Sequence, residues 1–249
     1  LVCRRLSPIF DDILPTVSYT GLISIVIPTV NEAPRLKATL APLLELENIE
    51  IIVVDGGSKD GTIDIAKQLS VRVISSSKGR GRQMNAGAAL ASGEVILFLH
   101  ADTQLPLDFA NHVWHVLNQG SIAGAFRLRI TGQSIGKRVV EWGTQLRSRL
   151  RQLPYGDQAI FVRASDFYRM QGYRNWPLME DYEFCQRLRR QGRIALANAE
   201  VQTSDRRWKK VGILRTTFRN QCCILAYHCG IPIGRIAMYY QHGSWFHAS

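Results

Sequence analysis

The chain has 249 residues, of which 46% are hydrophobic and 20% charged, so it can bury a sizeable core and is neither collagen-like nor low-complexity. Lys and Arg outnumber Asp and Glu by 31 to 20, a formal net charge of +11. Such a field attracts anions, which leaves nucleic acid, an acidic membrane surface or a phosphorylated substrate as candidate partners beside a merely basic surface.

The five cysteines are odd in number and irregularly spaced. They do not suggest a disulfide framework, and we expect a reducing compartment and a cytoplasmic location. The cluster near the C-terminus lacks zinc-site spacing and is expected to form one face of a buried helix. Its members are Cys222, Cys223, His228 and Cys229.

Residues 1–20 do not have the pattern of a signal peptide, because Pro8, Asp11 and Pro15 interrupt any apolar run. No stretch approaches the ~20 apolar residues of a spanning helix. We therefore expect a protein that is soluble or at most rests on the inner face of a membrane.

Apolar runs and helical patterns alternate over the first hundred residues. Strands are predicted at Ile23–Ile27, Ile49–Val54, Val71–Ile74 and Val95–Leu99, and helices at residues 34–44, 63–69 and 83–90. Pro42 should end or kink the first helix. The alternation predicts an α/β fold with a mostly parallel sheet and helices on both faces.

Beyond about residue 120 the pattern is less regular. Strands are predicted at Ile122–Ile130 and Gln158–Val162, and helices at Ile135–Leu150, Glu180–Arg190 and Val211–His228. No linker is visible, so a single domain is expected over residues 1–249.

Polar clusters follow three of the early strands, at residues 28–32, 55–62 and 100–103. The carboxyl ends of parallel strands meet at one edge of a sheet, where ligands bind in open α/β folds. The sequence therefore predicts a ligand site at this edge.

Two carboxylates in these clusters are candidates for ligand contact. Asp55 precedes Gly56, and it could accept hydrogen bonds from a base or a ribose, or could belong to a turn whose Ser58 or Asp60 caps the next helix. Asp102 could hold a divalent metal that bridges phosphate oxygens, or could simply cap a turn before Pro106.

Three further segments could contact a ligand, and the first two also have a structural interpretation. The glycine-rich loop at residues 78–82 could face a diphosphate, or be a solvated basic turn. Glu180 and Asp181 could serve a helix dipole, or one could be a general base. The basic, aromatic cluster at residues 204–208 could pair with phosphate.

Four motifs in order resemble glycosyltransferase family 2, whose members have the Rossmann-like GT-A fold. They are Ile-Val-Ile-Pro-Thr-Val-Asn-Glu at residues 25–32, Ile-Ile-Val-Val-Asp-Gly-Gly-Ser-Lys-Asp-Gly-Thr at 51–62, Gly-Arg-Gly-Arg-Gln-Met-Asn-Ala-Gly at 79–87 and Leu-Phe-Leu-His-Ala-Asp-Thr at 97–103. The resemblance runs from about Ile23 to Trp208. It implies a nucleotide-sugar-binding half at about 21–118 and an acceptor half at about 119–249.

The resemblance also implies roles for matching residues. Asp181 would be the catalytic base, beside Glu180. Asp102 would bind Mg²⁺ or Mn²⁺ with the donor diphosphate. The donor site would comprise Pro28, Asn31, Glu32, Asp55, Gly56, Arg82, Asn85, Ala101, Arg207 and Trp208.

One position departs from the family pattern. His100 stands where the first Asp of the Asp-x-Asp element is usual, which resembles a bacterial subgroup with Leu-His-Ala-Asp-Thr and Gly156-Asp157-Gln158. An imidazole can ligate Mn²⁺ but suits Mg²⁺ less well. The implied reaction is inverting transfer of a sugar from a nucleoside-diphosphate donor, with UDP favoured, to an unidentified and possibly lipid-linked acceptor.

Three other functions are alternatives. A sugar nucleotidyltransferase should have a Gly-rich basic loop directly after its first strand, which this chain lacks. A catalytically weak protein that binds nucleotide-sugars or membranes stays open because of His100. Nucleic-acid binding is not expected, since aromatics do not alternate with basic residues. Residues 211–240 could pack under the acceptor half or rest on a membrane.

Overall fold

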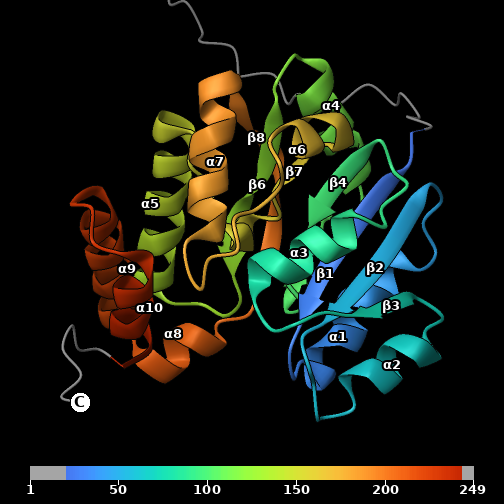
Figure 1. Cartoon of the computed structure of the whole chain (residues 1–249), viewed down its shortest axis with the longest axis horizontal. Coiled ribbons are helices and arrows are strands. Elements are labelled where there is room, and N and C mark those ends of the chain that lie inside the picture. The colour runs from blue at the N-terminus through green and yellow to red at the C-terminus, as the bar shows by residue number, and fades with distance from the viewer. Residues whose placement is uncertain (1–20, 243–249) are drawn as a thin grey trace, which may run out of the picture.

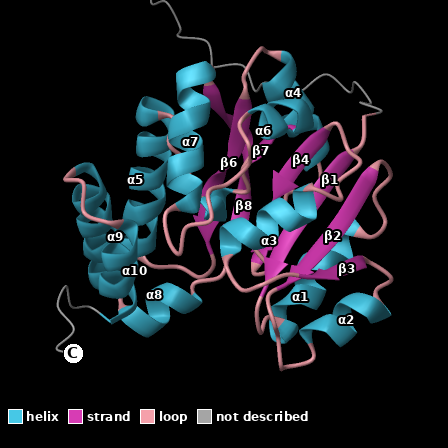
Figure 2. Ribbon diagram, viewed as in Figure 1, coloured by secondary structure: helices cyan, strands magenta, loops and turns pink. Residues whose placement is uncertain are grey.

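The computed structural model describes residues 21–242, in which one eight-stranded sheet is covered by helices (Figures 1 and 2). The strands lie in the order β3-β2-β1-β4-β7-β6-β8-β5. The predicted leader at residues 1–20, with Cys3, lies outside the described residues.

The first half alternates strand and helix as predicted. Its elements are β1 (Ile23–Thr29), α1 (Ala33–Leu40), a 3-10 turn η1 (Ala41–Leu43), β2 (Ile49–Asp55), α2 (Thr62–Gln68), β3 (Arg72–Ser75), α3 (Arg80–Ala88) and β4 (Val95–Phe98). β1 pairs in parallel with β2 and β4, and β2 pairs in parallel with β3. The predicted effect of Pro42 is confirmed, because α1 ends at Leu40 and tightens into η1.

β1 marks a switch in strand order that positions the site. The chain leaves β1 toward β2 on one side, whereas β4 returns to pair with its other side. In an open α/β sheet, such a switch leaves a crevice outside the carboxyl ends of the two neighbouring strands. The polar segments after β1 and β4 border this crevice.

Both faces of the early strands are buried, which explains their continuous apolar runs. Val26, Ile96 and Phe98 face a core shared with α3 and α7 (Glu180–Gln191). On the opposite face, Ile25 and Leu97 pack in a core shared with α1 and α4 (Phe109–Asn118).

The second half completes the same sheet. Its elements are β5 (Thr103–Gln104), α4, β6 (Ala123–Ile130), α5 (Ile135–Arg151), the 3-10 turn η2 (Gly156–Gln158), β7 (Phe161–Arg163), α6 (Ala164–Arg169), α7, β8 (Ile194–Thr203), α8 (Arg206–Val211), α9 (Ile213–His228) and α10 (Ile233–His242). The predicted α5 and α7 are confirmed. The predicted strand at 158–162 was misplaced, because Gln158 ends η2 and its side chain bonds the backbone of Tyr155 and Phe126.

The C-terminal cysteine cluster does not form one buried face, contrary to expectation. Cys223 is buried and Cys222 half-buried, whereas His228 and Cys229 are exposed at the end of α9. Adjacent residues point about 100° apart on a helix, so Cys222 and Cys223 cannot both face the core. The four cysteines within residues 21–242 are all free thiols. None of the helices in this range has both the length and the apolar character that spanning a bilayer requires.

Candidate active site

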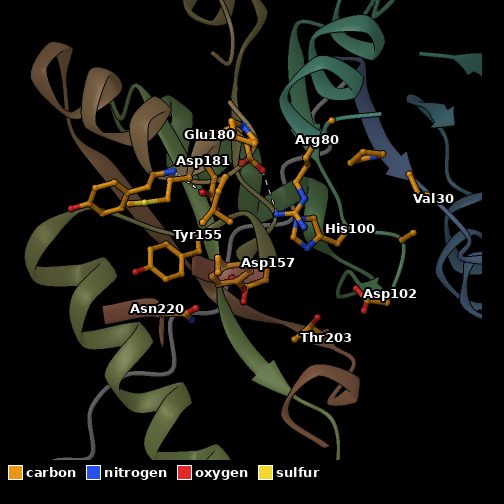
Figure 3. A pocket seen from close by; sticks show the side chains of 18 of the residues that line it. Val30, Arg80, His100, Asp102, Tyr155, Asp157, Glu180, Asp181, Thr203 and Asn220 are labelled. Carbon is orange, nitrogen blue, oxygen red and sulfur yellow. Dashed lines mark hydrogen bonds and ion pairs between the residues drawn. The ribbon is translucent and has the colours of Figure 1, made fainter. Parts of the chain in front are cut away.

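A pocket of about 620 Å³ opens at the carboxyl ends of β1 and β4 (Figure 3). The residues predicted as site residues that line it are Pro28, Glu32, His100, Ala101, Asp102, Glu180, Asp181 and Trp208. Segments far apart in sequence thus form one cavity, with the strand ends on one wall and the start of α7 on another.

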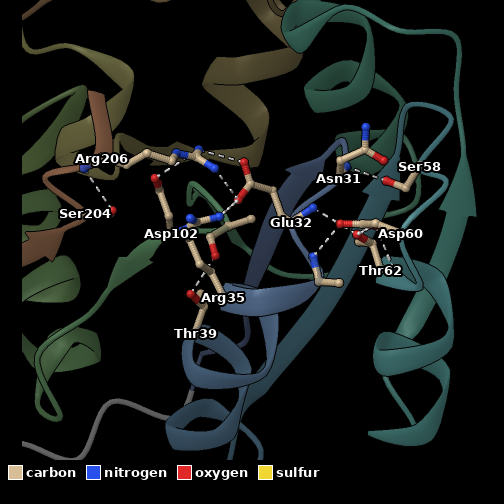
Figure 4. A network of polar contacts seen from close by, with 12 residues as sticks. Asn31, Glu32, Arg35, Thr39, Ser58, Asp60, Thr62, Asp102, Ser204 and Arg206 are labelled. Carbon is tan, nitrogen blue, oxygen red and sulfur yellow. Dashed lines mark hydrogen bonds and ion pairs between the residues drawn. The ribbon is translucent and has the colours of Figure 1, made fainter. Parts of the chain in front are cut away.

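The loops after β1 and β2 hold each other through side chains that bond backbone groups (Figure 4). The Asn31 N–H donates to Ser58 Oγ (2.8 Å), and the Lys59 N–H donates to Asn31 Oδ1 (2.8 Å). The Glu32 N–H donates to Thr62 Oγ1 (2.9 Å), and Asp60 accepts from the Ala33 N–H (3.1 Å). Ser58 and Asp60 therefore fix the loop before α1, so that Glu32 is presented to the pocket.

Asp55 is buried at the end of β2 and organises the turn that follows. Its Oδ2 accepts from the backbone N–H groups of Gly57 (2.8 Å) and Ser58 (2.9 Å). A side chain at Gly56 would come within 2.8 Å of Val30 and 3.0 Å of Gln83, so only glycine fits there. The turn expected after Asp55 is present, but the N-cap of α2 is Gly61 rather than Ser58 or Asp60.

A guanidinium bridges the two carboxylates at the strand-end wall (Figure 4). Arg206 donates to both oxygens of Glu32, at 2.9 and 3.2 Å, and lies 3.4 Å from Asp102 Oδ2. Burial raises the pKa of Asp102, and the Glu32 carboxylate adds to that increase while Arg206 opposes it. Arg35 also contacts Glu32 (3.3 Å), so cations already partly neutralise this acidic wall.

The backbone after β4 places Asp102 in this network. Thr39 of α1 donates to the Ala101 carbonyl (2.8 Å), and the Ser204 N–H donates to the Asp102 carbonyl (3.1 Å). The second bond brings the end of β8, and Arg206 after it, beside the end of β4. Asp102 does not cap the next helix, because α4 begins at Phe109 and its N-cap is Asp108.

Glu180 and Asp181 begin α7 abruptly, after Met179 in a left-handed backbone conformation (φ 64°). Glu180 is buried and pairs with Arg80 of α3 at 3.3 Å. Burial raises the pKa of Glu180, Arg80 opposes the increase, and Asp181 adds to it. Glu180 therefore holds a cation at the pocket rim, and Asp181 faces the cavity beside it (Figure 3).

Backbone N–H groups fix both oxygens of Asp181. Oδ2 accepts from the Gly156 N–H at 2.6 Å, and Oδ1 accepts from the Tyr182 N–H at 2.7 Å. A Cβ added to Gly156 would come within 3.0 Å of His100 Nε2 and 3.3 Å of Asp181 Oδ2. Gly156 thus lets the His100 imidazole and the Asp181 carboxylate approach the same peptide.

Tyr155 adds a hydroxyl to this wall. Its ring lies under the guanidinium of Arg147, 3.5 Å from the ring centre. Burial raises the pKa of Tyr155 to about 12, so the phenol keeps its proton at neutral pH. Its hydroxyl oxygen is buried without a hydrogen-bond partner among residues 21–242, so it can donate to a bound hydroxyl or phosphate.

The remaining predicted donor residues lie behind or beside the pocket lining. Asn31, Asp55 and Gly56 support the strand-end wall. Arg82 donates to Asn175 (2.5 Å), and Asn85 exchanges two hydrogen bonds with the Tyr173 backbone, at 2.7 and 2.9 Å. For Arg207 the structure describes only the backbone, within α8. Their donor roles stay predictions.

Sequence reasoning missed several residues that shape the pocket. Gln83 is buried and donates to the carbonyls of Thr29 (2.9 Å) and Val54 (2.8 Å), joining β1 to β2. Arg206 was one member of a basic cluster, and its pairing with Glu32 had no signal in the sequence. Tyr155 precedes the Gly-Asp-Gln motif at 156–158, and no pattern in the sequence marks it.

The donor set suits a divalent cation only in part. No group of three His, Cys, Asp or Glu side chains within residues 21–242 could enclose a metal ion. Mg²⁺ is commonly held by one or two carboxylates while substrate phosphates and water supply the remaining ligands. Asp102 fits that arrangement, since its Oδ2 now contacts a cationic guanidinium. His100 lies instead beside Gly156, where an added Cβ would come within 3.0 Å of its Nε2.

Comparisons with known proteins agree with this fold. Residues 24–177 match the family described as Glycosyl transferase family 2. A PGL/p-HBAD biosynthesis glycosyltransferase of Mycobacterium bovis is 40% identical over 93 residues, which cover 34% of this chain and 36% of that relative. A dolichol-phosphate mannosyltransferase of Pyrococcus furiosus is 33% identical over 108 residues, covering 40% of this chain and 31% of that relative. The matched stretch spans about a third of each relative's length.

Two solved structures share the GT-A fold at low sequence identity. A mannosyltransferase from Pyrobaculum calidifontis in complex with GDP-Man and Mn²⁺ has a TM-score of 0.61 and 20% identity, covering 75% of this chain and 57% of that chain. A glucosyl-3-phosphoglycerate synthase from Mycobacterium tuberculosis in complex with Mn²⁺ and UDP-Glc has a TM-score of 0.59 and 20% identity, covering 85% and 80%. Because the family match spans more than half of the sequence, the chain belongs to glycosyl transferase family 2.

Proposed function

We propose that this pocket transfers a sugar from a nucleoside-diphosphate sugar, with UDP favoured, to an acceptor hydroxyl with inversion at the anomeric carbon. The observation that carries the proposal is that Asp102 and Asp181 line one cavity on separate walls. One carboxylate stands at a strand end suited to a diphosphate, and the other stands free of that network. An inverting displacement needs these two functions on separate sides of the reacting carbon.

The strand-end wall would bind the donor. Pro28, Glu32 and Ala101 line it, and the loop that contains Lys78 and Arg80 adds cationic groups at the rim. These cations can stabilise the diphosphate as it leaves. The GDP-Man and UDP-Glc complexes of the two structural neighbours support a nucleotide-sugar donor, and the preference for UDP rests on the resemblance of the Asp55 turn to the family.

Asp181 would be the general base. Two backbone N–H groups orient it, so its carboxylate needs no further partner to stay in place. It would accept the proton of the acceptor hydroxyl while that oxygen attacks the anomeric carbon and the nucleoside diphosphate leaves. Tyr155 would donate to the acceptor side, and Glu180 would position Arg80. The family match ends at residue 177, so the roles in α7 rest on this geometry and on the Glu-Asp resemblance.

A divalent cation, Mg²⁺ or Mn²⁺, would be held by Asp102 together with the donor's own phosphate oxygens. When bound, it supplies neutralisation of the charge that develops on the leaving diphosphate. Glu32 would keep Arg206 near the phosphates once the Arg206 contact to Asp102 is released. Both structural neighbours were crystallised with Mn²⁺, which supports the choice of metal class.

A ligand panel tests the proposal. The melting temperature would be measured with UDP, GDP, ADP and their sugars, each with and without Mn²⁺. A ligand that binds only the folded state raises the melting temperature by mass action. We expect a metal-dependent increase with uridine nucleotides. No increase with any nucleotide would reject the donor site.

A further inference from the structure

Helix α5 has its apolar side facing outward, the reverse of a normal surface helix. Its exposed large apolar residues follow one another at helical spacing: Ile135, Val139, Trp142, Leu146 and Leu150. Ile135 is 87% exposed and Trp142 66%. The buried residues of the helix are all polar, namely Lys137, Glu141, Thr144 and Ser148. Since the two sets are offset by two residues, they lie on opposite faces.

The polar face is satisfied by the protein, so the orientation of α5 is well determined. Lys137 pairs with Asp205 at 2.6 Å and donates to the Thr131 carbonyl at 2.8 Å. Glu141 accepts from the Ile130 N–H at 2.7 Å, and Ser148 donates to Gln158 at 2.9 Å. Rotating α5 to bury its apolar stripe would break all of these bonds, which would leave buried polar groups unpaired.

Helix α9 has a matching stripe next to α5. Leu214, Phe218 and Leu225 are each more than 60% exposed and share one face. Gly136 of α5 lies against Ile213 of α9, which places the starts of the two stripes side by side (Figure 1). The opposite face of α9 lines the pocket, with Thr216, Asn220, Cys223 and Ile224. One helix therefore separates the pocket from an exposed apolar surface.

The charges around this surface are of one sign. Residues 206–242, which comprise α8, α9 and α10, contain seven Lys and Arg and no Asp or Glu. Arg206 pairs with Glu32 in the pocket and Lys209 pairs with Asp205, which leaves five other cations. In α5, Arg149 and Arg151 accompany the stripe, and the one acidic residue, Glu141, is buried and paired with Arg138. A second copy placed on this face would bring like charges together, whereas an anionic bilayer would complement them.

We propose that the outward faces of α5 and α9 form a docking surface for an anionic lipid bilayer. Apolar and aromatic side chains with flanking cations are the composition of helices that lie in a membrane interface. The docking itself stands apart from catalysis. Its consequence rests on the proposed function: a lipid-linked acceptor would reach the pocket past α9 without leaving the membrane.

Vesicle co-sedimentation tests the proposal, with phosphatidylcholine vesicles that contain or lack phosphatidylglycerol. We expect binding to the anionic vesicles that weakens with salt, and none to the neutral ones. The double variant Trp142→Ser/Phe218→Ser should lower the partition coefficient on the order of tenfold or more. Leu107→Ser is the matched control, because Leu107 is 79% exposed in the loop before α4 and should leave binding unchanged.

Other outcomes would overturn the proposal. Absence of binding to anionic vesicles at low salt would do so, as would equal loss in the double variant and in Leu107→Ser. Sedimentation velocity without vesicles tests whether a second copy of the chain binds this surface instead. If the wild type forms a dimer, the double variant is a monomer and neither binds vesicles, the surface serves self-association. Stabilisation of the double variant by UDP in vesicle-free buffer shows that it is folded, and separates failure of docking from failure of the donor site.

Discussion

The two carboxylate walls of the pocket are held in different ways. On the strand-end wall, Asp102 and Glu32 share the side chain of Arg206, which is 43% exposed and can move. On the opposite wall, Asp181 is held by the backbone N–H groups of Gly156 and Tyr182. The comparison teaches that a donor must rearrange one wall, whereas the proposed base is already in place. Preorganised groups of the second kind require no reorganisation during reaction.

Replacing the proposed base should give the largest effect. Asp181→Asn keeps the size of the side chain but removes its capacity to accept a proton, and it loses one of the two backbone hydrogen bonds because an amide nitrogen cannot accept from an N–H. We expect sugar release from the donor to fall about 10³-fold, within the range for general-base catalysis. Nucleotide affinity, measured by calorimetry, should stay unchanged. A matching loss of nucleotide affinity in a folded variant would move Asp181 to the donor site.

Adding a methyl group at Gly156, whose backbone N–H holds Asp181, should give the next largest effect. In Gly156→Ala the added carbon would meet His100 Nε2 at 3.0 Å and Asp181 Oδ2 at 3.3 Å, so one of them must shift. A displacement of that kind can lower the rate about 100-fold. Gly143→Ala in α5 is the control, because nothing lies within 4 Å of its added carbon. Equal rates for the two variants would show that Gly156 does not position Asp181.

The movable wall can be tested through Arg206. Arg206→Gln removes the cation that contacts Asp102, so Mn²⁺ should bind the nucleotide-free protein more tightly, by about fivefold or less for a partly exposed pair. Arg169→Gln is the control, because Arg169 pairs with Asp166 outside the pocket. Mn²⁺ binding would be followed by electron paramagnetic resonance. Weaker Mn²⁺ binding in Arg206→Gln than in the control would mean that the guanidinium supports the metal site.

The smallest expected effect is a pH-dependent stability difference at Asp102. Its pKa is raised by burial, so the folded state holds the proton more tightly than the unfolded state. Stability contributed by this group is therefore lost as pH rises above the ordinary range of an aspartate, near pH 4. Asp102→Asn should avoid that loss and be more stable than the wild type by less than about 1 kcal/mol at pH 7.

Melting curves of both proteins between pH 4 and 7 check this result. The gain of the variant should grow with pH. A variant that is less stable at pH 7 would show that attraction to Arg206 outweighs burial.

Sequence reasoning reached the first half of the fold because its strands are buried on both faces. Ile23–Ile27 and Val95–Leu99 are uninterrupted apolar runs, and the polar residues after them had to meet at one edge. β8 was missed, because Ile194–Thr203 alternates small, polar and apolar residues and is only partly buried. β5 has two residues, too few for a pattern.

The site was predictable to the extent that it follows strand ends and family motifs. His100, Asp102 and Asp181 all line the pocket. Arg206 and Glu32 are 174 positions apart in the sequence, and a pattern of neighbouring residues cannot predict a contact between residues so far apart. The reversed polarity of α5 was also invisible, because a periodic pattern states which residues share a face but not which face is inward.

Product analysis tests the central claim most directly. The protein would be incubated with UDP-sugars and Mn²⁺, and the released nucleotides would be separated by chromatography. Slow transfer of the sugar to water should release UDP in the wild type and in Gly143→Ala, but not in Asp181→Asn. Tight binding of the donor with no UDP released by any of the proteins would contradict the transferase proposal and leave a nucleotide-sugar-binding protein.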